Sequence, residues 1–329
     1  MKKTISILLA LIMTMVLALS CAASAEGDDY VIAVVPKVIG AAWFVRMDKG
    51  VQAFAAETGI DAYMTGPAEA DAATQAQYVQ DLIAAGVDAL CVVPYSTEAM
   101  EPVLKQAREA GIVVITHEAQ GMVNIDYDIE AFDNDAYGRH MMEKLAELMG
   151  GEGELVEMVG SLTSASHMQW ADAADAYIAE QGMNITTYGD RVETEDTQET
   201  AYVKTVEVLK ANPNIAGIYG TSMIDIPGAA QAVEEAGLSG KIKLCGTSLV
   251  SVAGKYIEDG TIDTIFFWDP ADAGYAMCAL AQKLLNGEEV GEGLDLGIDG
   301  YHNLTLVDNT FLGEAWVDVD INNMSEYDF

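Results

Sequence analysis

Basic residues are scarce in this sequence. Its 329 residues include 16 lysines and arginines against 52 aspartates and glutamates, which gives a formal net charge of -36 at pH 7. Nucleic acids and anionic membrane surfaces attract clusters of positive charge, so this composition argues against either as a partner. We expect no nucleic-acid partner, and we interpret the acidity as an adaptation for solubility.

Cysteine and histidine are also scarce. After Cys21 the only cysteines are Cys91, Cys245 and Cys278, an odd number without the spacing of metal ligands. Cys91 and Cys245 lie in apolar, strand-like runs, where a free cysteine behaves as a small core side chain. No two of the four histidines have ligand spacing either. We therefore expect no metal site and no other cofactor.

The common phosphate-binding and catalytic motifs are absent. The sequence holds no G-x-G-x-x-G, no Walker loop, no G-x-S-x-G and no H-E-x-x-H. The glycine-rich stretch at 150–153 precedes a predicted strand, so we interpret it as a helix-to-strand turn. Dehydrogenase, kinase and hydrolase functions lose their usual sequence support. We predict a protein that is not an enzyme and has no catalytic residues.

Residues 1–25 have the pattern of a secretory signal peptide. Lys2 and Lys3 precede an apolar run from Ile5 to Leu19, and small residues follow. The run is too short to cross a bilayer comfortably, and no later stretch reaches the roughly 18 apolar residues that a spanning helix needs. We therefore expect the mature protein to be extracytoplasmic.

Two cleavage patterns occur at the end of this segment. Ala18-Leu19-Ser20-Cys21 resembles a lipobox, which would make Cys21 the first mature residue and a lipid anchor. Ala23-Ser24-Ala25 before Glu26 fits ordinary cleavage equally well. The protein is accordingly expected either free in the periplasm or tethered to the outer face of the cell membrane as a lipoprotein.

Short apolar runs alternate with helical patterns from Tyr30 onward. The first set of predicted strands is 31–35, 61–64, 89–93 and 112–116, with helices at 44–55, 70–85 and 97–110 between them. The second set has strands at 155–159, 185–188, 215–219 and 242–245, with helices at 166–180, 196–209 and 225–236. This alternation predicts two doubly wound α/β units. A cleft should lie between them, faced by the carboxyl ends of the strands.

Polar and aromatic side chains follow these strand ends. An aromatic ring can pack on the C–H face of a sugar while fixed polar groups pair with its hydroxyls. Trp170 lies within a predicted helix and is expected in the core. The candidate ligand-binding residues are Lys37, Trp43, Phe44, Glu118, Ser166, His167, Thr221, Met223, Trp268 and Asp269.

Several short motifs resemble those of one protein family in the same order. They are Val35-Pro36-Lys37, Thr65-Gly66-Pro67, Gln169-Trp170, Trp268-Asp269-Pro270 and Tyr327-Asp328-Phe329. Over its whole mature length the chain resembles the type I periplasmic sugar-binding proteins of ABC transporters, and it is most similar to the autoinducer-2-binding and rhamnose-binding branch. The resemblance implies that Lys37 contacts the ligand. It also implies a membrane permease as partner.

The sequence departs from the autoinducer-2 pattern at most ligand-binding positions. Glu118 stands for an aspartate, Ser166-His167 for an Asp-Gln pair, and Thr221-Ser222-Met223 for Pro-Asp-Ala. Polar sites discriminate sharply when a partner is lost. We therefore expect a small neutral sugar or sugar-like molecule. The alternatives are autoinducer-2, a sensory role in chemotaxis, and a sugar-processing enzyme that uses Glu118 and His167 as acid and base.

The resemblance implies the periplasmic binding protein type I fold, with two Rossmann-like lobes joined by three crossovers. We place the N-terminal lobe at 26–118 plus 269–299 and the C-terminal lobe at 119–268 plus 300–329. The crossovers are then expected near Glu118, Trp268 and Gly300. The helix at 271–285 should return to the first lobe. We expect a monomer whose lobes close on the ligand.

Overall fold

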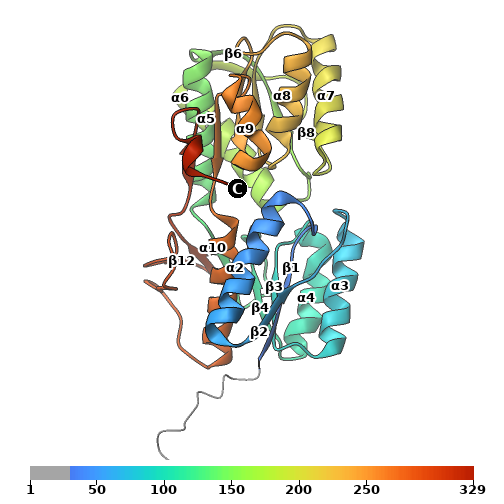
Figure 1. Ribbon diagram of the computed structural model, residues 1–329, viewed down its shortest axis with the longest axis vertical. Helices are drawn as coiled ribbons and strands as arrows, with labels where there is room; N and C mark the ends of the chain where they lie inside the picture. Colours follow the sequence, from blue (N-terminus) through green and yellow to red (C-terminus); the bar gives the residue numbers. More distant parts are fainter. Residues whose placement is uncertain (1–29) are drawn as a thin grey trace, which may run out of the picture.

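Two α/β lobes stack along the long axis of the molecule (Figure 1). The computed structural model describes residues 30–329, so the predicted signal peptide and Cys21 lie outside the described residues. No helix in the described range is long and apolar enough to cross a membrane. The predicted fold class, two doubly wound lobes around largely parallel sheets, is confirmed.

The N-terminal lobe has a seven-stranded sheet in the order β12-β13-β5-β4-β3-β1-β2. All neighbouring strands in it are parallel except β12 and β13. Its strands are β1 (Val31–Val35), β2 (Asp61–Met64), β3 (Ala89–Val92), β4 (Val113–Thr116), β5 (Tyr127–Glu130), β12 (Thr305–Val307) and β13 (Thr310–Leu312). Its helices are α2 (Ala42–Thr58), α3 (Ala72–Ala85), α4 (Thr97–Glu109) and α10 (Pro270–Leu285).

The C-terminal lobe has a sheet in the order β14-β11-β10-β9-β6-β7. Strand β8 pairs with the carboxyl end of β6. Its strands are β6 (Glu152–Val159), β7 (Asn184–Thr187), β8 (Val192–Glu193), β9 (Ile215–Gly220), β10 (Lys243–Thr247), β11 (Thr264–Phe267) and β14 (Val317–Val319). Its helices are α5 (Asn134–Met149), α6 (Ala165–Gln181), α7 (Gln198–Ala211), α8 (Asp225–Glu235) and α9 (Val250–Glu258), followed by a 3-10 turn at Met324–Glu326.

Local sequence signals explain where the elements begin and end. The residues of β3 are buried on both faces, which suits its continuous apolar run. The side chain of Ser96 accepts a hydrogen bond from the backbone N–H of Ala99 and so caps α4. Helix α2 ends at Gly59, whose φ of 77° lies in the left-handed region that glycine adopts without strain. Cys91, Cys245 and Cys278 are free and buried.

Two of the three predicted crossover positions are wrong. The first crossover is at 131–133, because β5 pairs in parallel with β4 and keeps 119–130 in the N-terminal lobe. Two acidic residues, Asp128 and Glu130, are buried in β5 and interrupt the apolar pattern that predicts a strand. The third crossover is at 313–316, since β13 pairs with β5. The second crossover lies at Trp268 and Asp269, as predicted.

Each crossover contributes one aromatic side chain to a cluster between the lobes. Phe132 lies in the first crossover, Trp268 in the second and Trp316 in the third. The ring centroids of Phe132 and Trp268 are 5.0 Å apart, and those of Phe132 and Trp316 are 5.5 Å apart, both in edge-to-face geometry. The three connecting strands are therefore packed together through their rings.

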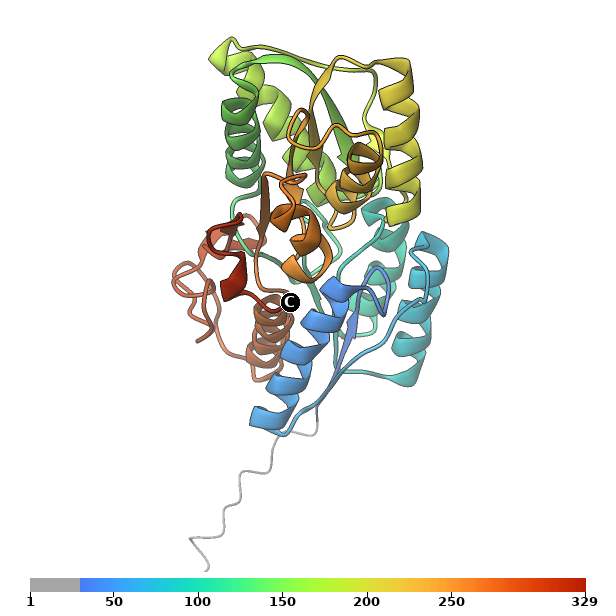
Figure 2. The same cartoon turned by 45° about the horizontal axis from the view of Figure 1, so that its top comes forward.

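Helix α10 returns to the N-terminal lobe, as predicted, and lies beside α2 in both views (Figures 1 and 2). The chain then ends in the C-terminal lobe. The guanidinium carbon of Arg46, on α2, lies 4.0 Å from the centroid of the Phe329 ring. Phe329 in turn accepts a hydrogen bond from the backbone N–H of Ser251 on α9. The last residue therefore contacts both lobes.

Candidate functional site

A pocket lies between the two lobes at the carboxyl ends of their strands. The space inside it is about 80 Å³, and about 540 Å³ when the open solvent at its mouth is included. The residues that line it are Lys37, Val38, Ala41, Trp43, Phe44, Glu118, His167, Trp170, Asp196, Thr221, Ser222, Met223, Ile224, Thr247 and Trp268. Both lobes and the second crossover contribute to this wall.

The structure brings together eight of the ten predicted ligand-binding residues in this pocket. They are Lys37, Trp43, Phe44, Glu118, His167, Thr221, Met223 and Trp268. The two others lie outside the lining. Ser166 sits behind Glu118 and donates a hydrogen bond to its Oε2 at 3.3 Å. The carboxylate of Asp269 accepts hydrogen bonds from Arg46 and from the backbone N–H of Ala271, where it caps α10.

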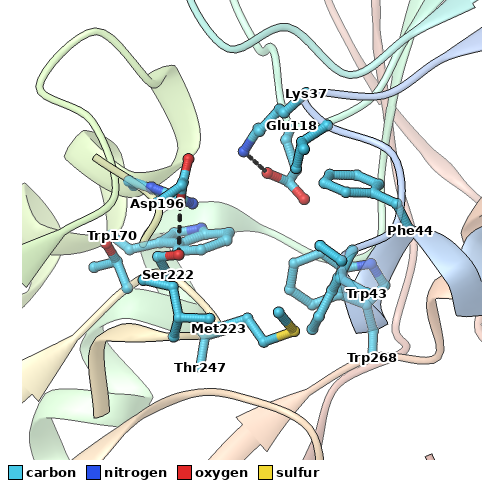
Figure 3. Close-up of a pocket in the computed structure, with 15 residues that line it drawn as sticks. Lys37, Trp43, Phe44, Glu118, Trp170, Asp196, Ser222, Met223, Thr247 and Trp268 are labelled. Carbon is cyan, nitrogen blue, oxygen red and sulfur yellow. Dashed lines mark hydrogen bonds and ion pairs between the residues drawn. The ribbon is translucent and has the colours of Figure 1, made fainter. Parts of the chain in front are cut away.

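Lys37 and Glu118 form a buried ion pair on the N-terminal side of the pocket (Figure 3). The Lys37 Nζ and Glu118 Oε2 atoms are 2.6 Å apart, and each residue is only 4 % exposed. Burial is the largest single influence and would raise the pKa of Glu118, but the charge and hydrogen bond of Lys37, together with His117 and His167, outweigh it and lower that pKa to about 2. Both groups are therefore charged at neutral pH, and their charges cancel.

His167 is a buried, neutral histidine on α6. It is 4 % exposed, and burial together with the nearby charge of Lys37 lowers its pKa to about 4. A neutral imidazole has one nitrogen that donates and one that accepts a hydrogen bond. His167 can therefore pair with a ligand hydroxyl in either direction.

Asp196, Ser222 and Thr247 line the pocket but were not predicted as ligand-binding residues, and Trp170 was expected in the core. Asp196 follows β8, a strand of two residues that is too short to give an apolar pattern. Ser222 lies two residues beyond β9 and Thr247 is the last residue of β10, so their strand-end position was the available signal. Trp170 is 1 % exposed and does belong to the core, but its ring also reaches the pocket. Its Nε1 donates to Asn134 Oδ1 at 2.6 Å.

Four pocket residues carry a buried polar side-chain atom that has no hydrogen-bond partner within residues 30–329. These atoms are the Nε1 of Trp43, the Nδ1 of His167, the Oδ2 of Asp196 and the Nε1 of Trp268. Buried polar atoms are paired in the great majority of cases, so a cluster of unpaired atoms around one pocket is unusual. The set contains donors and an acceptor, which suits a ligand that both donates and accepts.

Aromatic rings form much of the remaining wall. The rings of Trp43 and Trp268 meet edge to face with centroids 4.6 Å apart, and the centroids of Trp170 and Trp268 are 5.8 Å apart. Phe44 lies on the same side as the Lys37–Glu118 pair (Figure 3). No group of three or more histidine, cysteine, aspartate or glutamate residues in the described part of the chain could hold a metal ion. The aromatic rings suit a ligand that has an apolar face.

A two-lobed α/β fold with a pocket at the facing strand ends defines a class of ligand-binding proteins. Residues 32–289 match the family described as the periplasmic binding protein domain, and the chain belongs to this family. The D-allose-binding periplasmic protein of Escherichia coli is 29% identical over 252 residues, which span 74% of this chain and 80% of that protein. The ribose import binding protein of Bacillus subtilis is 23% identical over 88% of this chain and 95% of its own length.

Solved structures show the same fold. An ABC transporter solute-binding protein from Clostridium phytofermentas with bound L-rhamnose has a TM-score of 0.85 at 21% identity, covering 91% of this chain and 98% of that one. The LsrB protein from Clostridium saccharobutylicum in complex with AI-2 has a TM-score of 0.83 at 20% identity, covering 91% and 100%. The fold that the resemblance implies is thereby confirmed, and the neighbours that share it include a rhamnose-bound and an AI-2-bound protein.

Proposed function

We propose that this chain is an extracytoplasmic solute-binding protein that captures a small neutral sugar or sugar-like molecule between its lobes and delivers it to an ABC importer. The observation that carries the proposal is the set of four unpaired buried polar atoms in a pocket walled by aromatic rings. A sugar hydroxyl both donates and accepts hydrogen bonds, and the C–H faces of a sugar pack against aromatic rings. One ligand class thus satisfies both features.

The charges of the pocket favour a neutral ligand. Lys37 is paired with Glu118, and the pKa of His167 is lowered to about 4, so neither supplies a free positive charge at neutral pH. Asp196 adds a carboxylate without a basic partner among the described hydrogen-bonding groups. An anionic ligand would have to enter a buried site with an excess of negative charge, which is unfavourable at low dielectric.

The names of the relatives also support a sugar as the ligand. They include proteins named for the binding of D-allose, ribose and D-xylose, and the solved structures include complexes with L-rhamnose and D-arabinose. We propose that the partner of this chain is a membrane permease, that the chain acts as a monomer, and that it catalyses no reaction. We propose that the chain lies either free in the periplasm or tethered through Cys21 to the outer face of the cell membrane.

Autoinducer-2 is the second candidate ligand. The fold of the AI-2-bound LsrB protein supports it. Lys37, which the resemblance of Val35-Pro36-Lys37 to the branch's motif implies as a ligand contact, lines the pocket. The substitutions at Glu118, Ser166-His167 and Thr221-Ser222-Met223 count against it, because they change both the charge and the reach of the polar groups. A neutral pentose or deoxyhexose therefore remains the first choice.

A thermal-shift screen of residues 26–329 against pentoses, hexoses, deoxyhexoses, polyols and autoinducer-2 tests the proposal. Binding to the native state alone adds about 2.7 kcal/mol of stability at a hundredfold excess of ligand over the Kd. We expect a clear rise in melting temperature with at least one neutral sugar. A rise with autoinducer-2 alone would assign the second candidate, and no rise with any sugar or polyol would contradict the proposed ligand class.

A further inference from the structure

The loop that carries Asp196 is held in an unusual conformation. Glu195 has a φ of 56° and Asp196 a φ of 49°, so two consecutive residues other than glycine lie in the left-handed region. This conformation is unfavourable for residues with a Cβ, and it persists only where the surroundings impose it. The backbone N–H of Asp196 donates to the carbonyl of Gly160 at 3.1 Å, which holds the turn against the end of β6.

Gly160 makes room for the side chains of Asp196 and His167 at one spot. A Cβ at position 160 would lie 2.1 Å from Asp196 Oδ1 and 2.9 Å from His167 Cε1. Any other residue at 160 would therefore displace the carboxylate, the imidazole or both. The missing side chain and the strained turn are two independent features that place Asp196 beside His167.

One oxygen of Asp196 is fixed by the protein and the other is not. Ser222 Oγ donates to Asp196 Oδ1 at 2.6 Å, and this pair lies across the pocket from Lys37 and Glu118 (Figure 3). Oδ2 is buried and has no partner within residues 30–329, and the same holds for Nδ1 of His167. A carboxylate only accepts hydrogen bonds, so whatever satisfies Oδ2 must be a donor.

We propose that Asp196 determines the ligand specificity of this pocket by requiring a hydrogen-bond donor, a hydroxyl or amino group, at the end of the ligand that enters the C-terminal lobe. The inference rests on the proposed sugar-binding function and narrows it. Oδ2 accepts from the ligand, Ser222 holds the carboxylate in place, and His167 takes a second polar group of the ligand. A ligand with a carboxylate or phosphate at this end is rejected, because it offers no donor and repels the fixed charge of Asp196.

The test compares wild-type protein with Asp196→Asn, which keeps the shape of the side chain and removes its charge. Binding of D-ribose, D-allose, L-rhamnose, D-glucosamine and D-galacturonate is measured by calorimetric titration of the mature chain. Asp190→Asn is the matched control, because Asp190 is exposed on a loop of the same lobe and loses the same charge. Ser222→Ala is a second test variant that removes only the hydroxyl bonded to Asp196 Oδ1.

Wild-type protein should bind at least one of the neutral sugars and discriminate against galacturonate. We expect Asp196→Asn to weaken binding of that sugar by about tenfold or more, since a hydrogen bond to a charged group is lost, and to reduce discrimination against galacturonate by a similar factor. Ser222→Ala should weaken binding by roughly threefold to tenfold and keep the discrimination. Asp190→Asn should stay within about twofold of wild type.

The outcomes separate this inference from the proposed function. If the Kd of a neutral sugar for Asp196→Asn is within about twofold of that for wild type, and discrimination against galacturonate is unchanged, the inference is overturned and the proposed function stands. If wild type binds only glucosamine among the probes, and Asp196→Asn does not bind it, the inference is supported and the proposal of a neutral ligand is contradicted. Tight binding of galacturonate to wild type overturns the inference, and no binding of any probe contradicts both. If Asp196→Asn does not fold, an unchanged Kd in Ser222→Ala overturns the inference.

Discussion

At the scale of the residue, the Lys37–Glu118 pair dominates the electrostatics of the pocket. Both side chains are removed from water, so each depends on the other for compensation of its charge. Glu118 also has a φ of 57°, and Ser166 from the opposite lobe donates to its carboxylate. The pair therefore connects the N-terminal wall of the pocket to the C-terminal lobe.

Removing only one charge of the Lys37–Glu118 pair should destabilise the protein. Lys37→Met leaves the Glu118 carboxylate buried without its cation, and we expect the free energy of unfolding to fall by about 3–5 kcal/mol, measured by urea denaturation at pH 7. The double variant Lys37→Met/Glu118→Gln removes both charges and should recover part of that loss. Lys105→Met is the control, because Lys105 is exposed and lies 3.9 Å from Glu109, and it should change stability by less than about 1 kcal/mol. A Lys37→Met protein as stable as the control would contradict this interpretation.

His167 should make the stability of the protein depend on pH. Its folded-state pKa is lowered to about 4 from the usual 6.5. As the pH falls through 6.5 the unfolded chain binds a proton at this residue and the native state does not, so stability is lost between pH 6.5 and 4. The full loss is about 3 kcal/mol, and the contribution is complete above pH 6.5.

A comparison of wild type with His167→Gln isolates this effect. Other groups with shifted pKa values, such as Asp128 and Asp225, are common to both proteins and cancel in the difference. We expect the difference in unfolding free energy to be constant above pH 7 and to change by about 3 kcal/mol on acidification to pH 4, in favour of the variant. A difference that does not vary with pH would show that His167 is not buried in neutral form.

The residues of the site were predictable where they follow a recognisable strand. Lys37, Glu118 and Thr221 come directly after apolar runs, and the structure places all three in the pocket. Asp196 was not selected because β8 has only two residues and its turn is set by Gly160, a contact between segments far apart in sequence. Asp269 follows β11 just as closely, but Arg46 on α2 binds its carboxylate, and no strand-end pattern shows that partner.

At the scale of the element, α2 and α10 are packed more closely than ordinary side chains allow. A Cβ at Gly50 would lie 1.8 Å from the carbonyl oxygen of Ala271, and one at Gly274 would lie 2.6 Å from the carbonyl oxygen of Met47. Glycine is unfavourable within a helix, so its presence here indicates that close contact outweighs helix propensity. The contact anchors the returning helix to the first lobe and so fixes the second crossover.

Gly50→Ala should therefore destabilise the protein although alanine is the better helix former. We expect a loss of about 1–3 kcal/mol by urea denaturation, because the clash is with the backbone of α10 and cannot be relieved by a rotamer change. Gly254→Ala is the matched control within a helix. A Cβ there would lie 3.4 Å from the flexible end of Met324, so this change should be neutral or stabilising by up to about 1 kcal/mol. Equal effects of the two changes would contradict the close packing of α2 on α10.

The elements that sequence periodicity predicted are those with regular apolar runs. β1 and β2 begin and end where predicted, and the other predicted strands and helices differ from the structure mainly by a few terminal residues. The helices α5 and α9 and the strands β8, β11 and β14 were also not predicted. β5 was missed because Asp128 and Glu130 are buried within it, and β12 and β13 because three-residue strands give no period. These missed strands are the ones that set the first and third crossovers, which explains why those two boundaries were wrong.

At the scale of the whole molecule, the two lobes touch directly across the pocket. Ser166 on α6 donates to Glu118 at 3.3 Å, and Gln169 Nε2 donates to Gln120 Oε1 at 2.9 Å. Contacts of a ligand with both walls would add to them, and a ligand shifts an equilibrium by the difference in its affinity for the two forms. Ligand binding should therefore favour the form in which the lobes are closed.

The measurement that tests this account most directly is small-angle X-ray scattering of the mature chain without ligand and with each neutral sugar at saturating concentration. We expect the free protein to sample open forms, and the radius of gyration to fall when one neutral sugar binds, because the pocket lies between two lobes that three short crossovers connect. Galacturonate should leave the scattering unchanged. A protein that binds a sugar without any compaction, or that compacts only with an anionic ligand, would contradict the capture of a neutral sugar between the lobes.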